Sequence, residues 1–470
     1  MINTPLKLPL DPSFLPASIW TEQYRRQVRQ TAGSREVTIA LCSGTETVTH
    51  HTLHLMPPGQ MEAETFFHLE RTLKLLLWAR GGTRVMISGA DTEIPALQRV
   101  YSTQGRRAFD VDFFSRQIYK APLEIIAVRR EQLPPPRKTP VKLGGHLNGC
   151  RIGFDLGGSD RKCAALIDGE IVFSEEIPWD PYFQSDPEYH ITGIRDSLHR
   201  AAAHLPRVDA IGGSSAGVYM HNEVRAASLF RGISPEMFES RIRRLFLNLQ
   251  QEWGGIPFEI VNDGEVTALA GCQSLKCGSL LGISMGTSLA AGYCDAGGHI
   301  TPGLNELAFA PIDYRQDAPR DEWSGDQGCG VQYFSQQGVA RLAPPAGYAF
   351  PEDMPLAERL VHVQQDMAEG KPKAAAIFQT IGICFGYALA HYADFYDLHR
   401  VLLLGRVSSG PGGDVILEHA RAVLNKAFDG RHHHITLSMP DEKMKRHGQA
   451  IAAASLPMLT EIDQSKSQTL

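Results

Sequence analysis

The pattern of apolar and polar positions divides the first 130 residues into short strands and one long helix. Apolar runs bounded by turn residues, as in β-strands, occur in EVTIALCSG, HHTLHLMP, TRVMISG and PLEIIAVRR. Between the second and third of these runs, EAETFFHLERTLKLLLWAR has the spacing of an amphipathic helix. This order predicts a small α/β domain over residues 1–130, in which we find no catalytic motif.

The pattern stops at residues 131–149, where the chain reads EQLPPPRKTPVKLGGHLNG. Proline and glycine at this density support neither a helix nor a central strand. We therefore expect a linker here, followed by one or more further domains.

After the linker, apolar strands repeatedly end in turns of small or polar residues, as strands do at a ligand-facing sheet edge. The turn residues are Asp155 with Gly157, Gly158 and Ser159; Gly217; Asn262 with Asp263 at the start of an Ala-rich helix; Gly286, Thr287 and Ser288 in a hairpin; and Gly405. Glycines at a bend let backbone N–H groups approach phosphate oxygens, and a carboxylate such as Asp155 can hold a hydrated Mg²⁺. Taken alone, the first of these turns is equally well explained as an ordinary tight turn.

Length and composition indicate a globular protein with more than one domain. The chain has 470 residues, more than one core accommodates, with 43% hydrophobic and 21% charged residues. We find no window with the 18 or so apolar residues of a membrane span and no secretory signal, and the eight Cys lack regular spacing. We therefore expect a cytoplasmic protein that does not enter a membrane.

Charge argues against nucleic acid as a partner. The net charge is −6, and the basic residues of the first 149 residues are spread along the chain without a dense run. Such a distribution is typical of a solvated surface, so we expect no nucleic-acid binding.

From residue 150 to about 458, these motifs resemble the repressor, open reading frame and kinase (ROK) family of sugar kinases, in the actin and hexokinase superfamily. Asp155, Gly157, Gly158 and Ser159 fall on the family's first phosphate motif, Gly286 and Thr287 on its second phosphate hairpin, and Gly405 on the strand end that meets adenosine. Asn262 and Asp263 fall on its Asn-Asp pair, and KRHGQAIAAASLPML resembles its closing Ala-rich helix.

The resemblance implies two actin-like, ribonuclease H-like α/β lobes around a cleft, in addition to the N-terminal domain. The first lobe is expected at residues 150–275, closed by a helix at about 445–458, and the second at 276–444. ATP and Mg²⁺ are the implied ligands besides a sugar, and the family often forms homodimers.

The same resemblance gives Asp263 the role of general base, because a sugar hydroxyl is a poor nucleophile until its proton is withdrawn. Asn262, Glu306 and Gly217 are then the candidate contacts to the sugar. The alternative is that Asn262 or Asp263 only caps the helix, a common role for either residue type.

The chain departs from the family at its zinc site and at the second hairpin. Phe309 stands at the family's His ligand, Glu322 and Ser324 at two of its Cys ligands, and only Cys329 is kept. A structural Zn²⁺ ordinarily needs four N or S ligands, so we predict no zinc. Ser288, Ala290 and Ala291 also replace glycines, which limits how closely the backbone can approach a phosphate.

Two functions follow from these observations. The first is ATP-dependent phosphorylation of a hexose or N-acetylhexosamine hydroxyl. The second is a sugar-sensing regulator or interaction protein without catalysis, with the N-terminal domain as its output. The retained Asp263 favours the kinase, and the lost glycines and zinc ligands favour the sensor.

Overall fold

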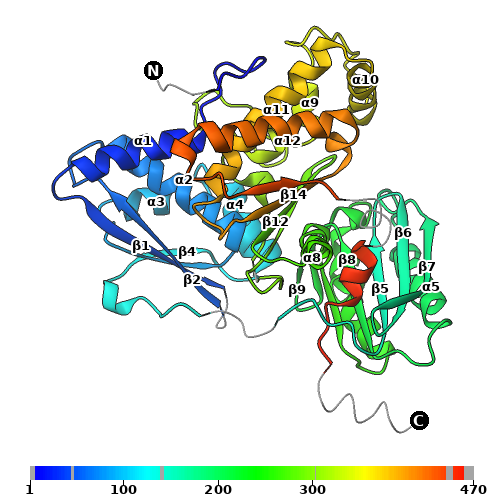
Figure 1. Cartoon of the computed structure of the whole chain (residues 1–470). Helices are drawn as coiled ribbons and strands as arrows, with labels where there is room; N and C mark the ends of the chain where they lie inside the picture. The colour runs from blue at the N-terminus through cyan, green and yellow to red at the C-terminus, as the bar shows by residue number, and fades with distance from the viewer. Residues whose placement is uncertain (1–5, 44–46, 138–141, 302, 441–447, 460–470) are drawn as a thin grey trace. The chain divides into compact units, whose positions relative to one another are not determined.

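The computed structural model describes residues 6–43, 47–137, 142–301, 303–440 and 448–459. The chain forms two compact units (Figure 1). Unit 1 comprises residues 1–140, 283–291 and 302–439, and unit 2 comprises residues 141–282, 292–301 and 440–470. The N-terminal segment is thus grouped with the second half of the chain, whereas we had expected it to form a separate domain.

The N-terminal part of unit 1 is an α/β structure, as the pattern predicts. Its sheet has the strand order β2-β1-β3-β4, in which β2 and β3 flank β1 in antiparallel fashion and β3 pairs with β4 in parallel. The elements are α1 (Ala17–Gln30), β1 (Arg35–Ser43), β2 (Thr47–Leu55), α2 (Glu62–Arg80), β3 (Arg84–Ser88), α3 (Ile94–Val100), α4 (Ala108–Asp112) and β4 (Glu124–Ala127). The four expected strands and the expected long helix α2 are confirmed, whereas α1, α3 and α4 were missed.

Helix α2 differs from the expected amphipathic helix because it is buried on all sides. Its buried residues run almost without interruption from His68 to Ala79 and include the charged residues Glu70, Arg71 and Lys74. An amphipathic pattern assumes that the polar face meets water. Here the polar face meets other charged side chains of unit 1.

The remainder of unit 1 is mainly helical. It contains α9 (Gln336–Leu342), α10 (Leu356–Ala368), α11 (Pro372–Tyr392), α12 (Pro411–Lys426) and the parallel strands β14 (Arg400–Leu404) and β15 (Thr436–Ser438). These strands continue a sheet of order β13-β12-β14-β15, which begins with β12 (Leu280–Met285) and β13 (Leu289–Cys294). Helices α11 and α12 pack side by side (Figure 1).

Helix α11 corrects one expectation from the sequence. An 18-residue window in it has a mean hydropathy of 1.4, which is apolar enough, in a helix of sufficient length, to cross a membrane. In the structure 83% of that window is buried, because the helix packs against α1 and α12. The expectation that no window is this apolar was therefore wrong, and the burial accounts for the composition.

Unit 2 contains the ribonuclease H-like sheet that the resemblance implies. The strand order is β11-β8-β5-β6-β7, with β5, β8 and β11 parallel and β6 and β7 antiparallel to their neighbours. The strands are β5 (Cys150–Leu156), β6 (Asp160–Ile167), β7 (Glu170–Pro178), β8 (Ala210–Ser215) and β11 (Phe258–Asn262), and a short pair is formed by β9 (Val218–Met220) and β10 (Glu223–Ala226).

Helices cover both faces of this sheet: α5 (Pro187–Ala202) contacts β5 and β6, while α13 (Gln449–Ala454) contacts β5, β8 and α8 (Asp263–Leu275). Two further helices are α6 (Pro235–Met237) and α7 (Leu245–Glu252). A Cβ on Gly212 of β8 would overlap the Ala453 carbonyl, so this glycine allows α13 to lie against the strand. The Ala-rich closing helix is thus confirmed over Gln449–Ala454, while residues 445–447 of the expected helix lie outside the described residues.

Candidate active site

Three parallel strand ends of unit 2 bring the predicted carboxylates to one edge of the sheet. In the register, Asp155 of β5 lies beside Ser214 of β8, which in turn lies beside Val261 of β11. The next two residues of the chain are Asn262 and Asp263. Because β5, β8 and β11 are parallel, their carboxyl ends meet at the same edge, where α/β proteins place ligands.

Asn262 is the N-cap of α8, so the capping alternative is correct for this residue. Its side-chain oxygen accepts a hydrogen bond from the Gly264 N–H at 2.7 Å, and its amide nitrogen donates to the Gly217 carbonyl at 2.8 Å. Both ends of the amide are therefore used inside the protein. Asn262 thereby fixes the position of the Gly217 turn relative to the start of the helix.

Asp263 is the first residue of α8 and is not its cap. One carboxylate oxygen accepts the Gly264 N–H at 2.9 Å, and the side chain is partly exposed. Burial raises the pKa of Asp263, and the groups that oppose this rise are backbone N–H groups rather than a side-chain cation. A carboxylate in this environment is more basic than an ordinary aspartate, as a general base requires.

Asp155 is buried close to Asp263. Burial raises the pKa of Asp155 to about 6, the polar side chain of Ser214 opposes the rise, and the negative charge of Asp263 adds to it. Lys162, which faces Asp155 across β5 and β6, lowers the pKa only in part. The charge of Asp263 thus acts on Asp155, so the two carboxylates lie near each other at this sheet edge.

Two polar neighbours of these carboxylates, Ser214 and Tyr219, were not among the predicted site residues. The phenol of Tyr219 is half-buried and donates to the Ala216 carbonyl at 3.4 Å. Burial raises the pKa of Tyr219, the nearby Ser215 opposes the rise and the charge of Asp263 adds to it. The signal in the sequence was the small-residue end of VDAIGGSSAGVY, which indicated a ligand-facing turn without showing which side chain faces Asp155 or Asp263.

The first predicted phosphate turn, Gly157 to Asp160, is tightly bonded within itself. The Gly157 N–H donates to the Asp160 carbonyl at 2.9 Å, and the Ser159 hydroxyl donates to the Asp160 carboxylate at 2.8 Å. A Cβ on Gly158 would overlap the phenol of Tyr182, so a larger residue there would require the Tyr182 side chain to move. The turn is therefore held by its own hydrogen bonds, and it carries the carboxylate of Asp160, which pairs with Lys162 at 3.5 Å.

The second predicted phosphate hairpin and the predicted adenosine residue lie together in unit 1. Gly286 donates its N–H to the Ser288 carbonyl at 2.9 Å, and Thr287 and Ser288 are exposed at the bend between β12 and β13. A Cβ on Gly405, at the end of β14, would come within 2.5 Å of the Met285 carbonyl. The close contact between these strand ends requires a glycine at position 405.

Glu306 also lies in unit 1, in a loop that contacts α2. Its N–H donates to the Trp78 carbonyl at 3.0 Å, and its side chain is partly exposed. The neighbouring Phe309, at the family's zinc-ligand position, packs its ring 4.5 Å from that of Trp78.

The other positions of the family's zinc site differ in their surroundings. Glu322 is exposed, the Ser324 hydroxyl donates to Asp321 at 2.7 Å, and Cys329 is fully buried with a thiol pKa raised well above its usual value by burial. The described residues contain no cluster of three or more metal-binding side chains. The absence of zinc stays a prediction for metal analysis.

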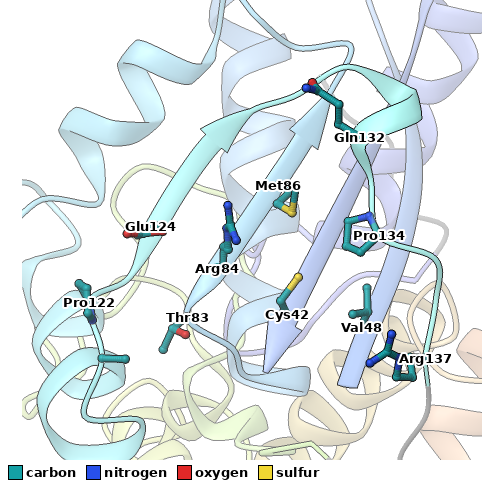
Figure 2. A pocket seen from close by; sticks show the side chains of 11 residues that line it. Cys42, Val48, Thr83, Arg84, Met86, Pro122, Glu124, Gln132, Pro134 and Arg137 are labelled. Atoms are coloured by element: carbon teal, nitrogen blue, oxygen red, sulfur yellow. The ribbon is translucent and has the colours of Figure 1, made fainter. Parts of the chain in front are cut away.

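A cavity of about 500 Å³ opens elsewhere, on the face of the N-terminal sheet (Figure 2). Cys42, Val48 and Met86 line it from the strands, and Pro134 and Arg137 line it from the following segment. None of the predicted site residues lines this cavity. We therefore assign it no part in the proposed chemistry.

Comparison with solved structures identifies the fold. The glucokinase of the ROK family from Streptomyces griseus, solved with glucose and AMPPNP, matches 66% of this chain and 99% of its own with a TM-score of 0.50 and 21% identity. The ROK hexokinase from Thermus thermophilus matches 68% of this chain and 99% of its own with a TM-score of 0.51 and 18% identity. This chain has the ROK sugar kinase fold.

The ROK fold accounts for about two thirds of the chain, in agreement with the extent of the resemblance found from residue 150 onward. No family model and no curated protein matches the sequence. At identities near 20%, the ROK fold by itself does not fix the substrate or the reaction. Those have to be argued from the side chains.

Proposed function

We propose that the protein transfers the γ-phosphoryl group of ATP to a hydroxyl of a sugar, a hexose or an N-acetylhexosamine, with Asp263 as general base. The observation that carries this proposal is the partly exposed Asp263 carboxylate at the N-terminus of α8, with a raised pKa and a second carboxylate beside it. The N-terminal end of a helix favours the ionised form of the carboxylate, and only the ionised form can accept a proton.

The roles of the neighbouring residues follow from their contacts. Asn262 holds Asp263 and Gly217 in register through its two hydrogen bonds. Glu306 is proposed to accept a hydrogen bond from the sugar. Gly286, Thr287, Ser288 and Gly405 are proposed to contact the nucleotide, since backbone N–H groups at such bends suit phosphate oxygens.

Mg²⁺ fits the residues near Asp155. Mg²⁺ is bound by hard oxygen ligands, usually one or two carboxylates together with water and substrate phosphates. The Asp155 carboxylate is destabilised by burial and by Asp263, so a cation nearby would relieve this cost. When bound with ATP, Mg²⁺ neutralises charge on the phosphates during transfer.

A sugar-sensing protein without catalysis is the second candidate, and one observation favours it. The turn at residues 157–160 uses the Gly157 N–H and the Ser159 hydroxyl for its own bonds and presents Asp160, whose negative charge Lys162 offsets only in part at 3.5 Å and which would repel a phosphate. In a sugar sensor, the hydrogen bonds of Asn262 would hold a sugar-binding site in place equally well.

One assay separates the two candidates. Purified protein is incubated with ATP, Mg²⁺ and each member of a panel of hexoses and N-acetylhexosamines, with coupled detection of ADP, and sugar binding is measured by calorimetry. Sugar-dependent ADP release supports the kinase. Sugar affinity without ADP release supports the sensor, and the absence of both refutes the two proposals.

We also propose that the protein is cytoplasmic. None of the eight cysteines, all within the described residues, forms a disulfide, as is usual in a reducing compartment. A homodimer stays a prediction, which light scattering would test.

A further inference from the structure

The end of α2 is joined directly to the loop that carries Glu306. A helix leaves the carbonyls of its last turn without partners inside the helix. In α2 the carbonyl of Trp78 accepts the N–H of Glu306 at 3.0 Å, and the carbonyl of Ala79 accepts the N–H of Asn305 at 3.0 Å. The N-terminal helix is thus capped by the backbone of the proposed sugar-binding loop.

Side chains hold the same loop in one conformation. Asn305 has φ 51°, a left-handed conformation that Asn tolerates better than most residues, and its side-chain oxygen accepts the Tyr396 hydroxyl at 3.0 Å. Phe309 packs on Trp78, as noted above. The loop that carries Glu306 is therefore held by α2 together with Tyr396.

A buried ion network fastens the next part of this segment to the N-terminal part of unit 1. Lys74 lies 2.9 Å from Asp110 and 2.7 Å from Asp326, and Arg107 lies 2.7 Å from Glu70 and also pairs with Asp326. The Lys74 side chain is 0% exposed and that of Asp326 is 8% exposed. Arg71 pairs with Glu70 at 2.7 Å, and we call the six residues Glu70, Arg71, Lys74, Arg107, Asp110 and Asp326 the ion network.

Asp326 is the member of the ion network that comes from the second half of the chain. The other five members lie on α2, on α4 or at Arg107, directly before α4. Asp326 therefore joins residues 303–329 to the N-terminal part, and it lies at one end of a segment whose other end is capped onto α2.

We propose that Asp326 is a positioning residue for sugar binding, which acts by holding residues 303–329 against α2 so that Glu306 faces the substrate. The inference rests on the proposed function, because it takes Glu306 as a sugar contact. In this proposal, the N-terminal part of the chain contributes to the reaction by fixing the position of Glu306.

The test compares two substitutions of the same kind, Asp326→Asn and Asp110→Asn. Each removes one carboxylate charge next to Lys74. After Asp326→Asn, Lys74 still pairs with Asp110 and Arg107 still pairs with Glu70, so each cation keeps a partner. After Asp110→Asn, the pairs that hold the loop are intact.

Steady-state kinetics and hydrogen exchange are measured on the full-length variants. For Asp326→Asn we expect the sugar KM to rise at least 10-fold with the ATP KM changed less than about 2-fold, and faster exchange of the Asn305 and Glu306 amides. For Asp110→Asn we expect the sugar KM and the exchange of these amides to stay within about 2-fold of wild type. Leu424→Ala, in the buried face of α12, serves as a control for general loss of stability.

The outcomes separate this inference from the proposed function. Equal changes in the two Asn variants, or a parallel rise of the sugar and ATP KM values, would overturn the positioning role and leave the kinase proposal standing. If wild type neither phosphorylates nor binds any sugar, the proposed function fails and the sugar-positioning role fails with it. In that case, amide exchange still shows whether Asp326 holds the loop.

Discussion

Two groups of buried or partly buried aspartates in this protein have opposite surroundings. In unit 2, Asp155 and Asp263 have raised pKa values because burial is offset only by backbone N–H groups at Asp263 and by Ser214 and Lys162 at Asp155. In unit 1, burial would raise the pKa of Asp326, but Lys74 and Arg107 lower it to about 2, whereas burial keeps the pKa of the neighbouring Asp110 raised. Asp326 is thus firmly ionised, whereas Asp155 and Asp263 are more basic than an ordinary aspartate.

The contrast shows how the two regions use burial. A buried ion pair stabilises a structure only when each charged group contacts a group of opposite charge and its remaining hydrogen bonds are also satisfied. A buried carboxylate without a cation costs stability, which is tolerated where the carboxylate takes part in chemistry. We therefore expect substitutions in unit 2 to change activity and those in the ion network to change stability and geometry.

The largest expected effect is on catalysis by Asp263→Asn. The substitution keeps the shape of the side chain and removes the group that accepts the sugar proton. If Asp263 is a general base, phosphorylation should fall by about 10² to 10⁴ with the fold intact, as measured by kcat and circular dichroism.

Asp186→Asn is the matched control for that substitution. Asp186 caps α5 by accepting the Glu188 N–H at 3.0 Å, and Asn caps equally well, so turnover should not change. Turnover that survives Asp263→Asn would show that Asp263 is not the base.

The second effect is on stability, through Lys74→Met. Removing Lys74 leaves Asp110 without its paired cation and weakens the pairing of Asp326 in a buried site. We expect a loss of about 3 to 5 kcal/mol in the free energy of unfolding, measured by urea denaturation.

Arg130→Gln serves as the comparison for Lys74→Met. Arg130 pairs with Glu36 at the surface, with its side chain 73% exposed, so little change in the unfolding midpoint is expected. Similar losses for the two variants would contradict a special role for the ion network.

The third effect is a gain in stability from Asp155→Asn at the expense of activity. The rise of the Asp155 pKa from 3.8 to about 6 makes its ionised form costly by about 3 kcal/mol in the folded state. The wild type bears little of this cost near pH 3.5, below the unfolded pKa of 3.8, and bears it fully above about pH 6.

Thermal unfolding of Asp155→Asn and wild type at several pH values checks this prediction. The variant should unfold at a higher temperature than wild type at pH 8, and the difference should disappear near pH 3.5. A variant that is less stable than wild type at pH 8 would mean that the carboxylate of Asp155 is stabilised in the fold.

The smallest expected effect is that of a chelator. Because the segment around Phe309 and Cys329 is held by aromatic packing and by the ion network, treatment with EDTA should leave the unfolding temperature unchanged. Metal analysis of protein purified without chelator should find no stoichiometric zinc. A stoichiometric zinc ion would show that the alignment of this loop with the family is wrong.

The sequence by itself determined the local features of the molecule. The apolar runs predicted the strands of the N-terminal sheet, and strand ends rich in glycine, serine and aspartate marked Asp155, Asn262 and Asp263. These features are readable because strand periodicity and turn residues act over a few neighbouring positions. Because parallel strands end at one sheet edge, three separate motifs of unit 2 also predicted one site.

Only the tertiary structure decided which charges would be buried together. Arg107 and Asp326 are 219 positions apart, and no local pattern relates them. The polar face of α2 was read as a solvent-facing surface, since a lone helix gives no sign that another segment will supply opposite charges. For the same reason the sequence could not show that the N-terminal part of the chain would cap its helix with the loop of Glu306.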